Sequence, residues 1–150
     1  MVPVKRAVEL GELGRVYNMP DEAGQWNESE STAWSAGLFA GAGGIDTVET
    51  KRIVTQERHK RLTQLEIHQH TPQVYAVLQG SVAVPVSADL DAASVALYRV
   101  EAGQAIVVNA KVWHAGAVAA DGPALVVVVL RKGTTELDTT KSPIDREIEL

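Results

Sequence analysis

The sequence contains no cysteine and has fewer basic than acidic side chains. Without thiols it can form neither disulfides nor thiolate metal sites, so any metal ion must be held by nitrogen and oxygen ligands. Its 14 Lys and Arg residues against 19 Asp and Glu residues give a formal net charge of -5. Such a surface repels phosphate, which disfavours nonspecific binding to nucleic acid or anionic membrane and favours a small-molecule partner.

Long apolar runs are missing as well. The most apolar segment, 124–130, is far too short to span a bilayer, where a helix needs about 20 residues, and it indicates a buried strand. Residues 1–6 are followed by charged residues and glycines instead of an apolar core, so we expect no ordinary secretory signal and a cytoplasmic protein. A chain of 150 residues with 45% hydrophobic content predicts a single globular domain over residues 1–150.

Short runs rich in Val, Ile, Leu and aromatic residues follow one another from Ala33 onward, with glycine, proline, Asp or Asn at the breaks. No long amphipathic helix pattern interrupts them. Nine short strands in one domain predict an all-β sandwich or barrel. The predicted strands are 34–40, 48–55, 62–70, 73–78, 81–86, 95–100, 105–108, 113–119 and 124–131.

The two ends of the chain carry weaker patterns. The first 30 or so residues have glycines, a proline and several acids without a sustained period, which predicts an irregular N-terminal arm with at most a short strand or turn. The tail from Lys132 is polar and charged, and Pro143 argues against a regular strand there. We expect this tail to wrap the barrel, to end in a short helix or to fray.

Three of the four histidines stand where a metal site would need them. His68 and His70 are two residues apart on one predicted strand, so both imidazoles point to the same face. After the turn at 71–72, the amide oxygen of Gln73 can reach the same centre, and His114 closes the set from a distant strand. We therefore predict a divalent metal ion held by His68, His70, Gln73 and His114. The alternative is a barrel whose histidines contact substrate directly.

The same residues resemble the two motifs of the cupin superfamily. The pattern His68-x-His70-x2-Gln73-x6-Gly80 is similar to the first motif, which has two histidines, a glutamate and a hairpin glycine. Gly103-x5-Asn109-Ala110-Lys111-x2-His114 is similar to the second. Gln73 replaces the glutamate and follows His70 one or two residues too early, and Lys111 replaces a glycine. The resemblance implies a cupin double-stranded β-helix barrel.

Within the cupins, the stretch from Glu66 through His68 and Gln73 to Gly80, together with 112–114, resembles ureidoglycolate lyases. That resemblance implies a cupin-fold homodimer that splits ureidoglycolate into glyoxylate and urea in purine catabolism. The sequence departs from the pattern at His70, Asn109 and Ala115, which leaves open a paralogue with another substrate. Other metal-dependent cupin enzymes, an isomerase or a dioxygenase, and a non-enzymatic cupin that binds a sugar or small metabolite are the competing functions.

Three further residues are candidates for catalysis in a lyase of this kind. Glu66 shares the strand parity of His68, so it should face the cavity and could take the proton of the substrate hydroxyl. Tyr75 could donate a proton or hydrogen bond to the leaving urea nitrogen, although a barrel-filling tyrosine has the same pattern. Lys111, in the loop before His114, could hold the substrate carboxylate, although most loop lysines are simply solvated.

Two points concern the metal and the assembly. Imidazole and amide ligands suit zinc, nickel, iron, copper or manganese without selecting among them. A neutral Gln73 in place of a carboxylate leaves the ion more positive, which favours an anionic carboxylate substrate. Leu65 and Ile67 should point away from the barrel centre, as should Trp113. These apolar side chains need a cover, and we expect a second subunit, in a homodimer, or the N-terminal arm to supply it.

Overall fold

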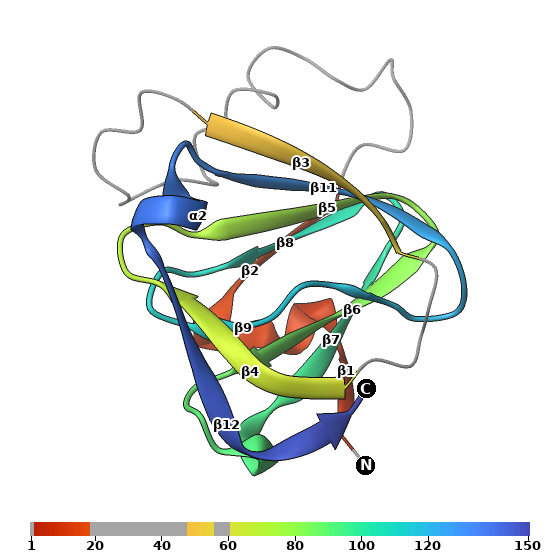
Figure 1. Cartoon of the computed structure of the whole chain (residues 1–150). Helices are drawn as coiled ribbons and strands as arrows, with labels where there is room; N and C mark the ends of the chain where they lie inside the picture. The colour runs from red at the N-terminus through yellow and green to blue at the C-terminus, as the bar shows by residue number, and fades with distance from the viewer. Residues whose placement is uncertain (1, 19–47, 56–60) are drawn as a thin grey trace.

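Two β-sheets face each other across a shared apolar core in the computed structural model, which describes residues 2–18, 48–55 and 61–150 (Figure 1). The larger sheet has the strand order β1-β7-β6-β9-β4-β12, with β10 paired to β6. Its strands are β1 (Val4–Arg6), β4 (Arg61–His68), β6 (Ser81–Ser87), β7 (Ala96–Glu101), β9 (Trp113–His114), β10 (Val118–Ala119) and β12 (Thr139–Glu149).

The smaller sheet has the order β2-β8-β5-β11-β3. Its strands are β2 (Gly14–Asn18), β3 (Val48–Thr55), β5 (Gln73–Gln79), β8 (Gln104–Val108) and β11 (Ala124–Arg131). Short helical turns complete the described chain at η1 (Ala7–Leu13), η3 (Ala92–Ser94) and α2 (Thr134–Leu137). All pairings are antiparallel except that of β1 with β7.

Strand alternation builds the core between the sheets. Along β11 the side chains of 124, 126, 128 and 130 are buried while their neighbours are partly exposed. Val84 of β6, Tyr98 of β7 and Ile106 of β8 belong to the same buried cluster. Burial of this apolar area is the main favourable contribution to folding. The described chain is built mainly of β-strands in two facing sheets, as predicted.

The central strands lie close to their predicted positions. Strands β3 and β11 have the predicted bounds, β5, β6 and β8 differ from prediction by one residue at one end, and β7 is shifted by one residue. The predicted strand 113–119 is divided into β9 and β10, and β4 ends at His68 instead of His70. The predicted strand 34–40 lies outside the described residues.

The C-terminal tail differs most from expectation, because it forms the 11-residue strand β12. Pro143 is accommodated because β12 is an edge strand, where a residue without an N–H leaves no pairing bond unmade. The register between β12 and β4 shifts between Pro143 and Ile148. At the other end of the chain, β1 and β2 add an edge strand to each sheet, so this part of the N-terminal arm is more regular than predicted.

Strand β12 also supplies the cover that the outward face of β4 needs. Leu65 is 1% exposed and packs in a cluster with Ala92, Val95 and Ile144, the last of which belongs to β12. Trp113 packs against the same cluster. The cover that we expected from a second subunit or the N-terminal arm therefore comes largely from the C-terminal strand. Among the described residues, no helix is long and apolar enough to cross a membrane.

Gly80, in the hairpin between β5 and β6, allows a test of how closely this turn packs against Pro123. Gly80 has φ of +74°, and a Cβ there would lie 2.6 Å from the Pro123 carbonyl oxygen. We expect Gly80→Ala to lower the free energy of unfolding by about 2 to 3 kcal/mol, measured by urea denaturation. Gly103→Ala is the control, because it has φ of +85° and open space around it, and should cost only about 1 kcal/mol. Equal losses would contradict the close contact at Gly80.

Candidate metal site

Four polar side chains from both sheets meet inside one end of the barrel. Strand β4 carries Glu66 and His68, which point the same way, and Glu66 pairs with His114 of β9 in the sheet register. Gln73 opens β5 of the opposite sheet, directly after the buried Thr71 turn. His68, Gln73 and His114 are buried, and the Glu66 side chain is 23% exposed. The site therefore reaches solvent on the side of Glu66.

The possible ligand atoms of this group lie close to one another. One atom each from Glu66, His68 and His114 can be chosen so that all lie within 4.8 Å of one another. Gln73 Oε1 lies 2.7 Å from His68 Nε2 and 3.3 Å from His114 Nε2. Two imidazole nitrogens, an amide oxygen and a carboxylate oxygen form a donor set of the kind that first-row divalent metals accept.

The protonation of His114 follows from its surroundings. Burial lowers the pKa of His114 to about 4, so the ring is neutral at pH 7. Its Nδ1 lies 2.9 Å from the Val112 carbonyl oxygen, which can only accept a hydrogen bond. The single ring proton therefore sits on Nδ1, and Nε2 presents a lone pair to the site.

That lone pair faces other acceptors. His114 Nε2 lies 3.3 Å from Gln73 Oε1 and 3.7 Å from Glu66 Oε1, and amide and carboxylate oxygens are both hydrogen-bond acceptors. Acceptors that face one another in a buried space repel, and a cation between them turns the repulsion into coordination. The residues present thus fit a divalent metal ion on chemical grounds.

Tyr75 fixes which end of Gln73 faces the imidazoles. The Tyr75 hydroxyl accepts a hydrogen bond from Gln73 Nε2 at 2.5 Å and donates one to the Ala115 carbonyl oxygen at 3.2 Å. Burial raises the pKa of Tyr75 well above its usual value, so its hydroxyl stays protonated. With both bonds made, Tyr75 holds the Gln73 amide so that Oε1 points to the two Nε2 atoms.

His70 lies apart from this group. Its side chain is 75% exposed, and its Nδ1 is 2.8 Å from Asp138 Oδ1. The Asp138 carboxylate also accepts the backbone N–H groups of Gln69 and His70, each at 3.0 Å. Because β4 ends at His68, the strand alternation that was expected to turn His70 inward stops two residues before it. The structure thus differs from the predicted ligand set, and Glu66 takes the inward position instead.

Lys111 helps to position the loop before His114 through its backbone. Its φ of 65° is the only positive value at a non-glycine residue among the described residues, and its N–H donates to the His68 carbonyl oxygen at 2.7 Å. Its side chain is exposed, and no described hydrogen bond or ion pair involves its Nζ. The left-handed conformation explains why the second cupin motif has glycine at this place. The loop before His114 is thereby tied to the end of β4.

The sequence held a signal for the inward position of Glu66. Glu66 and His68 share a face of β4, and the four residues between His68 and Gln73 fit the first cupin motif better than the two after His70. Thr139 and the Asp138 carbonyl, which contact His68 Nδ1, were missed. They lie 70 residues away in a polar tail, where no local pattern marks them.

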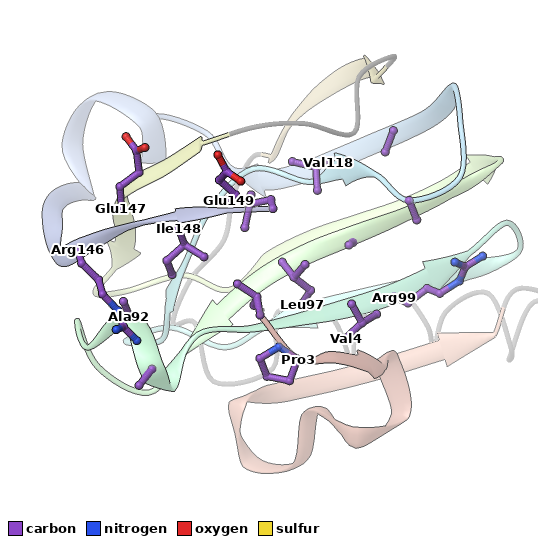
Figure 2. A pocket seen from close by; sticks show the side chains of 16 residues that line it. Pro3, Val4, Ala92, Leu97, Arg99, Val118, Arg146, Glu147, Ile148 and Glu149 are labelled. Atoms are coloured by element: carbon purple, nitrogen blue, oxygen red, sulfur yellow. The ribbon is translucent and has the colours of Figure 1, made fainter.

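A groove lies elsewhere, on the outer side of the seven-stranded sheet (Figure 2). Its lining includes Leu97, Val118 and Ile148, with Arg146 and Glu149 at its rim, and none of the four converging side chains takes part in it. The groove therefore offers no donor set comparable to that inside the barrel.

The sequence matches the ureidoglycolate lyase family over residues 27–150. This span contains every residue of the candidate site. No match was found among curated protein sequences.

Solved structures with a similar fold include sugar isomerases. A 3,4-ketoisomerase, QdtA from Thermoanaerobacterium thermosaccharolyticum, aligns with a TM-score of 0.55 at 14% identity, over 86% of this chain and 87% of that one. A dTDP sugar isomerase from Desulfovibrio desulfuricans gives 0.51 at 19% identity, over 88% and 83%. The 11S globulin procruciferin from Brassica napus gives 0.45 at 11% identity, and the alignment spans only 23% of its length. At these identities the isomerases share the fold alone.

The lowered pKa of His114 predicts how the stability of the metal-free protein depends on pH. Between pH 6.5, the ordinary pKa of histidine, and about pH 4, His114 is protonated in the unfolded chain and neutral in the folded chain. Folding stability should therefore fall as pH drops through this window, by up to about 1.4 kcal/mol per pH unit. Urea denaturation in a chelator should show the stability difference between wild type and His114→Asn shrinking from about pH 7 to 5. A difference independent of pH would contradict a buried neutral imidazole.

Proposed function

Because the chain belongs to the ureidoglycolate lyase family, we propose that it is a metal-dependent lyase that splits ureidoglycolate into glyoxylate and urea, or acts on a related small α-hydroxy acid. The observation that carries this proposal is the convergence of Glu66, His68, Gln73 and His114 inside the barrel. A cytoplasmic location, expected from the sequence, belongs to the same proposal.

In this proposal the two Nε2 atoms, Gln73 Oε1 and one Glu66 oxygen hold a divalent ion such as zinc, nickel, manganese or iron. When bound, the ion would supply Lewis acidity that lowers the pKa of a substrate hydroxyl. With two neutral imidazoles and a neutral amide, Glu66 is the one negative ligand. A divalent ion therefore leaves the site with a net positive charge, which favours an anionic substrate carboxylate.

In this proposal Glu66 carries out the proton transfers. Glu66 lies at the solvent side of the site, and its carboxylate has a second oxygen that can accept the α-hydroxyl proton of the substrate. As that O–H bond breaks, a C=O bond forms at the same carbon and the C–N bond to urea breaks. The departing nitrogen keeps the bonding electron pair and takes up the proton that Glu66 has accepted, so that the net change is the transfer of the hydroxyl proton to urea and Glu66 returns to its carboxylate form.

Tyr75 and Lys111 have supporting parts in this proposal. The Tyr75 hydroxyl is committed to Gln73 and Ala115, so it orients a ligand instead of protonating the urea nitrogen. The backbone of Lys111 holds the loop of His114 against β4, and its exposed ammonium group is free to attract the substrate carboxylate.

Turnover of ureidoglycolate without oxygen tests the proposal. We expect the metal-loaded protein to release glyoxylate and urea in equal amounts under anaerobic conditions, and Glu66→Gln to lower kcat/KM by about a hundredfold or more. Glu12→Gln is the matched control, since it makes the same chemical change at an exposed position of η1, and should keep wild-type activity. Saturable binding of ureidoglycolate without product, or oxygen consumption with an iron-loaded protein, would refute the lyase assignment.

We also propose a homodimer, formed through the groove of Figure 2. Its apolar floor includes Leu97 and Val118, and its rim carries the exposed Arg146, Glu147 and Glu149. A two-fold axis places the same surface on both sides of an interface. A rim with both signs of charge can then pair Arg146 of one copy with an acidic side chain of the other.

Light scattering in solution tests the assembly. At micromolar concentration the protein should have twice the chain mass of 16.1 kDa. Arg146→Glu should shift the population toward the single chain, because acidic side chains of the two copies would then face each other where Arg146 had met one. A wild-type mass of one chain would contradict the homodimer and leave the metal site untouched.

A further inference from the structure

The two imidazoles of the candidate site are held by different parts of the chain. His114 Nδ1 bonds to Val112, two residues away on the same loop. His68 Nδ1 instead contacts the Asp138 carbonyl oxygen at 3.3 Å and Thr139 Oγ1 at 3.2 Å. Both contacts come from the segment where α2 ends and β12 begins.

The Asp138 carbonyl oxygen and Thr139 Oγ1 both act as hydrogen-bond acceptors toward His68 Nδ1. The Asp138 carbonyl oxygen can only accept a hydrogen bond. The Thr139 hydroxyl donates its own hydrogen to the Thr134 carbonyl oxygen at 2.9 Å, so it presents a lone pair to His68. His68 Nδ1 therefore faces two acceptors, while its Nε2 faces a third, Gln73 Oε1, at 2.7 Å. A metal ion bound to Nε2 would need the lone pair of that nitrogen, and the ring proton would then lie on Nδ1, where Asp138 and Thr139 can accept it.

The acceptor pair is itself held firmly against β4. Thr139 pairs with His68 in the register between β12 and β4. The Asp138 carboxylate accepts the N–H groups of Gln69 and His70, and the Asp138 N–H donates to the Thr134 carbonyl oxygen at 3.0 Å. Thr134, which is 2% exposed, donates its hydroxyl to the Arg131 carbonyl oxygen at 2.7 Å. The segment 134–139 thus has little freedom to move away from the imidazole.

We propose that Thr139, together with the Asp138 carbonyl, is a positioning element for the metal site, which holds the His68 ring in the orientation and tautomer that leave Nε2 for the ion. This inference rests on the proposed metal site and adds a role for the C-terminal segment, which contributes no ligand. A hydrogen bond from the far nitrogen of a metal-binding histidine typically accounts for about 10- to 100-fold in metal affinity.

Zinc affinity of Thr139 variants tests the proposal. Thr139→Val keeps the shape of the side chain and removes the acceptor, and it should weaken Zn²⁺ binding about tenfold or more in competition with a chromogenic chelator. Thr139→Ser keeps the hydroxyl and should bind Zn²⁺ as the wild type does. Thr140→Val is the matched control, because Thr140 is the exposed neighbour on the same strand, and it should also leave the affinity unchanged.

Two further measurements separate positioning from stability and from the metal site itself. Unfolding of the metal-free variants by urea reports any general loss of stability, and NMR of the imidazole nitrogens in the zinc-loaded protein should show the His68 proton on Nδ1. Unchanged zinc affinity in Thr139→Val, or a His68 ring bound through Nδ1, would overturn the inference. A wild-type protein that binds no zinc, nickel, manganese or iron would instead refute the proposed metal site.

Discussion

Acceptor atoms that face one another without a proton between them are the constraint on which the site depends. The His114 lone pair points at the Gln73 amide oxygen and toward the Glu66 carboxylate, all within a largely buried space. Each orientation is enforced from behind, by the Val112 carbonyl for His114 and by the Tyr75 hydroxyl for Gln73. When a fold holds hydrogen-bond acceptors against one another in a buried space, their repulsion lowers the stability of the folded state unless a cation binds between them. This arrangement is the physical reason for proposing a metal centre.

The barrel brings these atoms together because the site lies where its two sheets meet. Glu66 and His114 are neighbours in one sheet, and Gln73 begins a strand of the other. The C-terminal strand β12 has a double role in the same region. It covers the apolar outer face of β4 through Ile144, and it starts at Thr139 against the ring of His68. Stability of β4 and orientation of a candidate ligand therefore depend on one segment.

The features that depend on the alternation of side chains along a strand could be predicted from the sequence. The features that depend on contacts between distant residues could not. The strands from 48 to 131 could be placed from their apolar runs and turns, and the inward face of His68 and Glu66 followed from parity. The end of β4 could not be placed, because Asp138, 68 residues beyond His70, binds the backbone that would otherwise continue the strand. Pro143 argued against β12 only as an interior strand, and its position at the sheet edge is a property of the whole fold.

Anomalous diffraction from crystals grown with Zn²⁺ tests the central claim most directly, because it locates the ion without reference to activity. The account predicts one strong anomalous peak at bonding distance from Nε2 of both His68 and His114, with Gln73 Oε1 and a Glu66 oxygen beside it. A barrel interior without a peak, or a peak bonded to His70 in place of Glu66, would contradict it.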